Sequence, residues 1–466
     1  MYSLRHWSVR HASALKRVYD AGARIAPYLQ RPLRWAGRQR MERLLEPIER
    51  ASKHLLFDCQ MCGQCALSST GMACPTNCAK QMRNGPCGGV RADGGCEVHP
   101  EMRCVWVEAT DGRKRIGESR DKTFLEPIDH RLWRHSSWLR VIEGTHSSPT
   151  PIRPNPMPER ETFGFERACA SGRFVATVEV SPPDSTDPTE LVARAARFRD
   201  LVDAVNITDG AGANCHMSSA AAAAILAANG LVPVAQFSCR DRNRIALQGD
   251  ILGAAALGVR NILCLTGDDV SNGDHPSAKP VFDIDSITLL RTTRQMRDGG
   301  TFASGRKLQV APNLFLGATA NPFVPPYRDR IDNLERKIDA GAQFIQTQFC
   351  FDVPLLEDFM HEIRTRELHK RCAIIVGVGT LSSAKALRHM AAHVPGVHIP
   401  DAVLRRIAGS DNQKAEAKAV LIETIRAVRA IDGVRGVHLM GYRNDETLAQ
   451  AIEESGIRGD ANTRAA

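Results

Sequence analysis

Short apolar runs and helical segments alternate eight times in the C-terminal part of this 466-residue chain. The runs are rich in β-branched residues, and we expect strands at 174–180, 204–208, 232–238, 261–266, 310–317, 344–349, 373–377 and 436–440. Apolar residues at helical spacing predict helices at 190–202, 218–228, 242–257, 286–297, 331–340, 355–366, 383–393 and 414–431. Consecutive apolar positions, followed each time by a helix, indicate a parallel sheet buried on both faces. Eight such units predict an α/β fold, a (β/α)8 TIM barrel, with a doubly wound open sheet as the alternative.

A proline-rich segment separates this barrel from the first part of the chain. Residues 145–160 contain five prolines, Pro149 to Pro158, and proline at that density favours an extended spacer. We therefore expect a basic helical leader at 1–57, a cysteine-rich metal or cluster domain at 58–144, a linker at 145–165 and the barrel at 166–460.

The leader carries most of the net charge of +9, because residues 1–57 contain twelve Lys or Arg against four Asp or Glu. Such a helical segment, with Trp7 and Trp35, suits a membrane surface, a nucleic acid or an acidic redox partner. A helical arm that packs on the rest of the protein is the favoured interpretation. We find no export signal and no membrane-spanning stretch, so we expect a cytoplasmic protein with reduced cysteines.

Eight of the fourteen cysteines lie close together in a pattern that begins C-x2-C-x2-C-x8-C-P. This spacing is typical of iron–sulfur proteins, so we expect [4Fe-4S] clusters; zinc is the main alternative and a purely structural or disulfide role is the weakest. Eight thiolates are enough for two four-ligand sites. The predicted ligands are Cys59, Cys62, Cys65, Cys74, Cys78, Cys87, Cys96 and Cys104. The other six cysteines are expected to be buried and inert.

Polar residues follow the predicted strands, at the end where a barrel carries its chemistry. Glu179 lies between two valines, and a poorly hydrated carboxyl there would suit a general acid. Asp209 and Asp269 are more simply explained as solvated strand ends or helix N-caps. Amides and carboxylates that converge on one pocket suit a flat heterocycle such as a pterin or a flavin. The chain has no phosphate-loop, G-x-S-x-G or H-E-x-x-H motif, and no convincing G-x-G-x-x-G unit after a strand.

The barrel half resembles the methylenetetrahydrofolate reductase family. The resemblance rests on Glu179 to Pro183, on Thr266 to Asp268, on the helix from Asn333 to Ala342, and on Thr347 to Phe349 with Phe351 and Asp352 after it. The segment FDCQMCGQCALSSTGMACP, with RNGPCGGVR and CEV, is similar to the cysteine-rich domain that accompanies some of these reductases. Together the two matches cover about 50–110 and 170–455.

This resemblance implies a flavin, usually FAD, that delivers a hydride to the methylene carbon of a folate. By position, Glu179 matches the general acid and Asp268 the acid beside flavin and pterin, so both are predicted to be catalytic. Gln348, Asp268 and Gln236 are the predicted substrate-binding residues. The predicted cofactor-binding residues are Thr208, Gln236, Gly267, Asp268, Asn321, Asn333 and Lys337. A homo-oligomer is also expected.

Three departures from the family pattern concern the cofactor and the electron donor. Gln236, Asn321 and Ala384 stand where better-known reductases have His, Tyr and a stacking Phe. FMN is therefore an alternative to FAD, and a reduced ferredoxin-like protein, acting through the cysteine clusters, is an alternative to NADH. A pterin-dependent methyltransferase or methyl carrier with structural zinc is the second candidate function. A nucleic-acid-binding protein is disfavoured, because aromatic residues make up only 5% of the chain.

Overall fold

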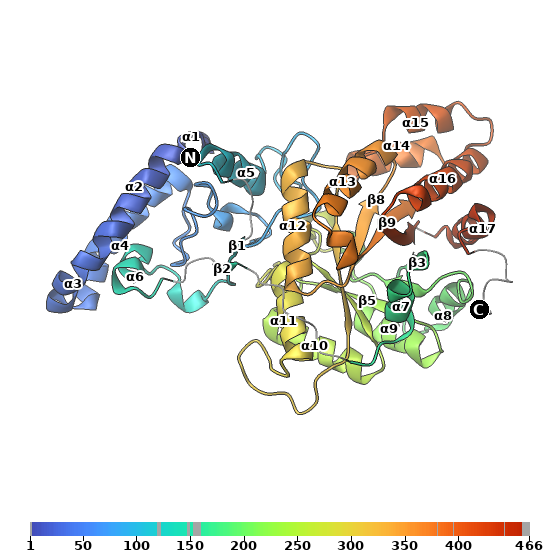
Figure 1. Cartoon of the computed structure of the whole chain (residues 1–466), viewed down its shortest axis with the longest axis horizontal. Helices are drawn as coiled ribbons and strands as arrows, with labels where there is room; N and C mark the ends of the chain where they lie inside the picture. Colours follow the sequence, from blue (N-terminus) through green and yellow to red (C-terminus); the bar gives the residue numbers. More distant parts are fainter. Residues whose placement is uncertain are drawn as a thin grey trace.

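The computed structural model describes residues 2–118, 123–146, 150–151, 160–379, 381–394, 396–441 and 443–458. Figure 1 shows a helical N-terminal part at one side and a barrel surrounded by helices at the other. The N-terminal part contains the eight clustered cysteines. None of the described helices is long and apolar enough to cross a membrane.

In the described part of the chain, eight parallel strands close into a barrel in the order β10-β3-β4-β5-β6-β7-β8-β9. The closed order confirms the predicted TIM barrel and excludes the open sheet. The barrel strands are β3 (Val175–Val180), β4 (Ala204–Ile207), β5 (Pro233–Ser238), β6 (Asn261–Leu265), β7 (Phe315–Ala320), β8 (Phe344–Phe349), β9 (Ala373–Gly379) and β10 (Val434–Met440).

Helices follow the strands and bury the outer face of the sheet, which explains why the strands are apolar at consecutive positions. They are α8 (Thr189–Ala196), α9 (Ser219–Ala228), α10 (Arg244–Ala256), α11 (Ser286–Asp298), α12 (Tyr327–Ala340), α13 (Val353–Thr365), α14 (Ala384–His393), α15 (Asp401–Ala408), α16 (Gln413–Ala430) and α17 (Asp445–Ser455). Short 3-10 helices are η4 (Ala211–Ala213), η5 (Val270–Asn272) and η6 (Leu368–Lys370).

Helix α7 (Gly164–Ala170) closes the N-terminal end of the barrel. Its Phe165 ring lies 5.5 Å from Phe315 and 5.3 Å from Phe344, edge to face, at the first residues of β7 and β8. Because these apolar side chains fill this end, the open cavity of the barrel lies at the opposite end.

Strand β7 begins later than predicted. The sequence favours a strand at 310–317, but Val310 is 82% exposed and the strand starts at Phe315. Pro312 has no N–H to donate to a neighbouring strand, so the segment before Phe315 cannot join the sheet.

The predicted leader is helical. The N-terminal part contains α1 (Tyr2–Arg10), α2 (Ala12–Ile25), η1 (Ala26–Leu29), α3 (Gln30–Ala36), α4 (Arg38–Phe57), η2 (Pro75–Asn77), α5 (Val105–Arg115), η3 (His130–Leu132) and α6 (Ser137–Glu143). Helix α1 packs against α4 and α5, and Arg5 pairs with the buried Glu108 of α5. The far end of the leader is open to solvent, with Trp35 91% exposed.

The predicted linker at 145–165 is only partly irregular. Strand β2 (Thr150–Pro151) pairs antiparallel with β1 (Thr123–Phe124), and α7 begins at Gly164, before the expected barrel start at 166. Residues 147–149 and 152–159 lie outside the described residues, so most of the proline-rich stretch is not tested. The remaining domain boundaries stay predictions.

Candidate functional site

The carboxyl ends of the barrel strands surround a cavity of about 1320 Å³ that opens to solvent. Strands β3 to β8 and β10 contribute to its wall, together with α12 and residues 80–97 of the cysteine-rich part. The nine barrel residues predicted for the site all line it: Glu179, Thr208, Gln236, Gly267, Asp268, Asn321, Asn333, Lys337 and Gln348. Residues far apart in the sequence thus meet at one place.

Glu179 is less buried than its sequence neighbours suggested. Val178 and Val180 are fully buried, whereas the Glu179 side chain keeps 26% of its surface exposed in the cavity. Successive side chains of a strand point to opposite faces, so the valines pack outside the barrel while the carboxylate points inward. Gln236 Nε2 donates a hydrogen bond of 3.1 Å to Glu179 Oε2. The Glu179 carboxyl is therefore more hydrated than the sequence predicted, although it does line the predicted site.

His438 is a buried cavity residue that the sequence analysis missed. It lies on β10, with Nε2 3.8 Å from Glu179 Oε2 and Nδ1 2.9 Å from Thr177 Oγ1. A polar residue inside an apolar predicted strand is the signal that singled out Glu179, and the same signal marks His438.

The segment after β6 brings Gly267 and Asp268 to the cavity. Gly267 has φ +99°, and a Cβ there would lie 2.2 Å from Ser238 Oγ. Only glycine suits this close approach. Asp268 Oδ2 accepts a hydrogen bond of 3.1 Å from the Gly212 amide.

Of the two strand-end carboxylates explained more simply as solvated ends or helix N-caps, Asp269 is an N-cap, whereas Asp209 is neither: it is buried and paired at the wall of the cavity. Asp209 accepts a 2.8 Å hydrogen bond from the Ser238 amide and pairs with Arg242. Burial raises the pKa of Asp209, although Arg242 opposes this. Asp269 caps η5 through the Ser271 amide.

The cysteine-rich part covers one side of the cavity. Lys80 Nζ donates 2.7 Å to the Gly267 carbonyl and pairs with Glu97. Asp285 Oδ2 accepts from the backbone amides of Arg83 at 3.1 Å and Asn84 at 2.7 Å. These bonds attach residues 80–84 to the barrel.

Two predicted cofactor residues hold this covering segment. Asn321 Nδ2 donates to the carbonyls of Gly88, at 2.7 Å, and Gly396, at 2.8 Å. Asn333 Nδ2 donates to the Gly85 carbonyl at 3.2 Å. The sequence analysis did not foresee this role, because it depends on contacts between two parts of the chain.

Lys337 and Thr208 present buried polar atoms to the cavity. Lys337 Nζ donates 2.6 Å to the Thr319 carbonyl, and burial, with repulsion from Arg330 and Arg336, lowers the pKa of Lys337 to about 8. Thr208 Oγ1 is buried and has no hydrogen-bond partner among the described residues. A buried hydroxyl without a recorded partner, and a buried ammonium beside two arginines, are costly unless a ligand adds a hydrogen bond or a negative charge.

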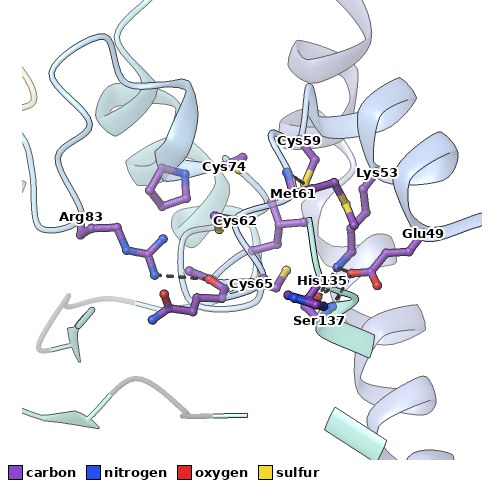
Figure 2. Close-up of a pocket in the computed structure, with 15 residues that line it drawn as sticks. Glu49, Lys53, Cys59, Met61, Cys62, Cys65, Cys74, Arg83, His135 and Ser137 are labelled. Atoms are coloured by element: carbon purple, nitrogen blue, oxygen red, sulfur yellow. Dashed lines mark hydrogen bonds and ion pairs between the residues drawn. The ribbon is translucent and has the colours of Figure 1, made fainter. Parts of the chain in front are cut away.

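The structure sorts the eight predicted metal ligands into two groups of four. The first group surrounds a small pocket beside the C-terminal half of α4 (Figure 2) and contains Cys59, Cys62, Cys65 and Cys74. A hydrogen bond between Cys59 and Cys74 lowers the pKa of Cys74 and raises that of Cys59. Burial disfavours the charge of Lys53, but the Cys65 thiolate and Glu49 raise the Lys53 pKa overall.

The second group lines a separate small pocket and contains Cys78, Cys87, Cys96 and Cys104. Burial and then the nearby Cys104 raise the pKa of Cys78 to about 12. Cys87 belongs to this group and also lines the barrel cavity. The second group therefore adjoins the candidate site directly.

Four thiols around one cavity match the donor sets of structural zinc and of iron–sulfur clusters. In the ranges that the structure describes, however, no three Cys, His, Asp or Glu side chains are arranged to hold an ion as they stand. The metal ligands and the kind of metal therefore stay predictions. Of the six remaining cysteines, five are buried as expected, whereas Cys215 is exposed, so the expectation was wrong there.

A closed barrel with converging polar groups at the carboxyl ends of its strands is the arrangement of a TIM-barrel enzyme. Residues 164–456 match the family model described as methylenetetrahydrofolate reductase, and residues 39–131 match one described as methylene-tetrahydrofolate reductase C terminal. The chain therefore belongs to the methylenetetrahydrofolate reductase family of oxidoreductases. The second match includes all eight clustered cysteines.

Individual relatives agree with this assignment. The chain is 24% identical to 5,10-methylenetetrahydrofolate reductase of Pectobacterium carotovorum, over 65% of this chain and 97% of that protein. It is 24% identical to methylenetetrahydrofolate reductase 2 of Schizosaccharomyces pombe and 27% identical to a probable NADPH-dependent reductase of Caenorhabditis elegans. These matches cover 47% and 52% of this chain, but only 35% and 34% of those longer relatives.

Among solved structures, a Clostridium thermocellum protein described as binding two copies of 5-methyl-5,6,7,8-tetrahydrofolic acid aligns over 62% of this chain and 97% of its own. The sequence identity is 15% and the TM-score is 0.43, so this likeness carries no argument about function.

Proposed function

We propose that this chain is a flavin-dependent methylenetetrahydrofolate reductase, which interconverts 5,10-methylene- and 5-methyl-tetrahydrofolate. The observation that carries the proposal is the single cavity that all nine predicted barrel residues line. Family membership supports the same reaction.

The cavity fits a flavin, with FAD as the first choice and FMN as the alternative. The unpartnered Thr208 hydroxyl and the buried Lys337 ammonium offer a donor and a positive charge for its polar and phosphate groups. When bound, the flavin would supply the hydride that reduces the methylene carbon. Gly267 lets the backbone approach closely at the same wall.

The protein's own residues would handle the proton and the charge. Glu179 would protonate the ring nitrogen that leaves the methylene carbon, which opens the folate's five-membered ring. Asp268 would stabilise the positive charge that develops, because a fixed carboxylate acts strongly in a partly dehydrated cavity. Gln348 would bind the pterin through its amide, and Gln236 would orient Glu179 by the hydrogen bond described above.

We propose further that electrons reach the cavity through the cysteine-rich part, from a ferredoxin-like donor. Two iron–sulfur clusters would supply one-electron transfer in the two cysteine groups. Support comes from Cys87, which borders both the second cysteine group and the barrel cavity. Cys87 Sγ lies 3.5 Å from Glu97 Oε1, and Glu97 pairs with Lys80, which bonds the Gly267 carbonyl. This gives a continuous polar connection from the thiol to the wall of the cavity.

An absorbance spectrum and two anaerobic titrations test the proposal. The purified protein should show flavin bands together with a broad iron–sulfur shoulder, and reduced ferredoxin should bleach the flavin bands faster than NADH does. Cys87→Ser should slow bleaching by ferredoxin, whereas Cys372→Ser, which changes a buried lone cysteine of the barrel, should leave it unchanged. If neither donor bleaches the flavin, both donor hypotheses fail.

Folate turnover tests the catalytic assignment separately. Glu179→Gln should retain the flavin and its reduction but lose most of the reaction with methylenetetrahydrofolate, because an amide cannot donate the required proton. Full folate turnover by this variant would refute the role of Glu179.

A pterin-dependent methyltransferase or methyl carrier with structural zinc is the second candidate. The observation that favours it is the use of Asn321 and Asn333, expected to contact a flavin, to hold the segment around 85–88. A colourless protein that contains zinc by elemental analysis and binds methyltetrahydrofolate would support this candidate over the reductase.

A further inference from the structure

A chain of buried side chains inside the barrel leads to Glu179. Asn206 and Gln346 exchange two amide hydrogen bonds, of 2.6 and 3.1 Å, across the barrel. Gln346 Nε2 also donates 3.1 Å to Thr177 Oγ1, which lies 2.9 Å from His438 Nδ1. Thr177, Asn206, Gln346 and His438 are all at most 3% exposed.

This arrangement determines which ring nitrogen of His438 carries the proton. A threonine hydroxyl has one proton to donate and can accept from other groups. Gln346 Nε2 can only donate to Thr177 Oγ1, and His438 Nδ1 is the one acceptor recorded for the Thr177 hydroxyl proton within the described residues. The proton is therefore directed to His438 Nδ1, which acts as the acceptor. The neutral ring then carries its proton on Nε2, the nitrogen that faces Glu179.

The Nε2 proton of His438 points to one carboxylate oxygen, Oε2 of Glu179. The distance of 3.8 Å from Nε2 to Glu179 Oε2 is longer than a hydrogen bond, and the same oxygen accepts from Gln236 at 3.1 Å. Such contacts are commonly long in an enzyme without substrate and shorten when substrate binds. Two donors, one from β5 and one from β10, thus converge on a single oxygen.

We propose that His438 is a positioning residue, which Thr177 holds as the Nε2–H tautomer so that it stabilises the Glu179 carboxylate formed by proton donation. The inference rests on the proposed function and concerns only the transfer of one proton from Glu179 to the folate ring nitrogen. No electron moves in this step. In the reverse direction the same contact would hold Glu179 as the base.

Other ionisable groups around the cavity are farther along its wall or occupied elsewhere. Asp268 bonds the Gly212 amide, and Asp209 pairs with Arg242. The remaining ionisable side chains of the wall, none of which is recorded in contact with Glu179 within the described residues, are Lys80, Cys87, Glu97, Arg240, Arg330 and Lys337. His438 is thus the ionisable neighbour through which Glu179 would respond to a change at Thr177.

The test compares the pH–rate profiles of four variants in the step that consumes folate. The flavin of each protein is reduced with dithionite, mixed with 5,10-methylenetetrahydrofolate and followed at the flavin absorbance. His438→Leu should lower this rate about tenfold, as expected for loss of a hydrogen bond to a charged group. Its alkaline limb should move to higher pH, since the carboxylate form of Glu179 loses a donor. His438→Gln, which retains an N–H near the position of Nε2, should recover part of both effects.

Thr177→Val tests the tautomer of His438 separately, because it removes the hydroxyl that bonds Nδ1 and leaves the histidine in place. It keeps the shape of residue 177 but removes the hydroxyl, so the profile should move in the same direction as that of His438→Leu, by less. Thr293→Val is the matched control, because Thr293 is an equally buried threonine on α11 that bonds the Leu289 carbonyl. The control should have the wild-type profile.

The outcomes distinguish this inference from the proposed function. A wild-type protein that holds no flavin or does not react with methylenetetrahydrofolate refutes the proposed function itself. If the wild type reacts and Thr177→Val and His438→Gln both give the wild-type rate and profile, the positioning role is refuted. Flavin content is measured for each variant and shows whether His438→Leu has folded. If it has not, the profiles of Thr177→Val and His438→Gln decide whether His438 has the positioning role.

Discussion

Lys337 should make the ligand-free protein less stable than it would be with an uncharged side chain at this position. Burial and the neighbouring Arg330 and Arg336 lower its pKa from 10.5 to about 8. That difference corresponds to about 3 kcal/mol of unfavourable free energy at pH 7, where the lysine is protonated in both the folded and unfolded states. The hydrogen bond from Nζ to the Thr319 carbonyl recovers about 1 kcal/mol of this cost.

We therefore expect Lys337→Met to increase the free energy of unfolding by about 2 kcal/mol at pH 7. The gain should disappear in alkali. Between pH 8 and 10.5 the unfolded chain binds the Lys337 proton more strongly than the folded protein does, so wild-type stability rises with pH in this window. At pH 9.5 the cost of the lysine is smaller by about 2 kcal/mol, and wild type and variant should be nearly equal.

Urea unfolding followed by circular dichroism, at pH 7 and at pH 9.5 without added flavin, measures both differences. Lys385→Met is the control. Because Lys385 is exposed on α14, its replacement should leave the free energy of unfolding unchanged at both pH values. A Lys337→Met protein that is less stable than wild type at pH 7, or a difference that is the same at both pH values, would refute the reasoning. If Lys337 binds a cofactor phosphate, the same variant should also retain less flavin.

Four further substitutions test other parts of the structure. Asp285→Ala removes the acceptor for the Arg83 and Asn84 amides and the N-cap of α11, and should lower the free energy of unfolding by about 3 kcal/mol; an unchanged urea midpoint would argue against this docking contact. Cys62→Ser and Cys104→Ser should each remove about half of the bound metal in elemental analysis, since each changes one group of four; loss of all metal from either variant would contradict two separate sites. Gly267→Ala places a Cβ 2.2 Å from Ser238 Oγ at φ +99° and should reduce flavin retention, so wild-type flavin content would count against the close approach.

Much of the barrel could be predicted because each unit is local. A run such as 373–377 is apolar enough to be a buried strand by itself, and the structure has a strand at Ala373–Gly379. The strand beginning at Phe315 was predicted too early because Val310 has a suitable side chain, while Pro312 lacks the required N–H. Polar residues at the strand ends, such as Glu179 and Gln236, could be named for the same reason, since a barrel brings those ends together. Asn333 and Lys337, which lie on a helix, were named only from the resemblance to the family.

Contacts between distant segments could not be predicted in this way. The division of the cysteines into two groups depends on how the loops from 59 to 104 fold back, and spacing alone only allowed for two sites. The use of Asn321 and Asn333 to hold the segment around 85–88 requires both parts of the chain to be in place. His438 was missed although it lies in a predicted strand, because its importance comes from Thr177 and Glu179 on another strand.

The sequence by itself determined the (β/α)8 architecture, the cysteine-rich segment before it and the set of barrel residues that could meet at one end, because strand pattern and metal-ligand spacing are properties of short stretches of chain. Only the tertiary structure decided that the second cysteine group borders the barrel cavity, which oxygen of Glu179 faces His438, and how Lys337 comes to have a lowered pKa. The first two features depend on distances between segments that are far apart in the sequence, and the third depends on the burial of α12 against the rest of the barrel, so all three exist only once the barrel has closed.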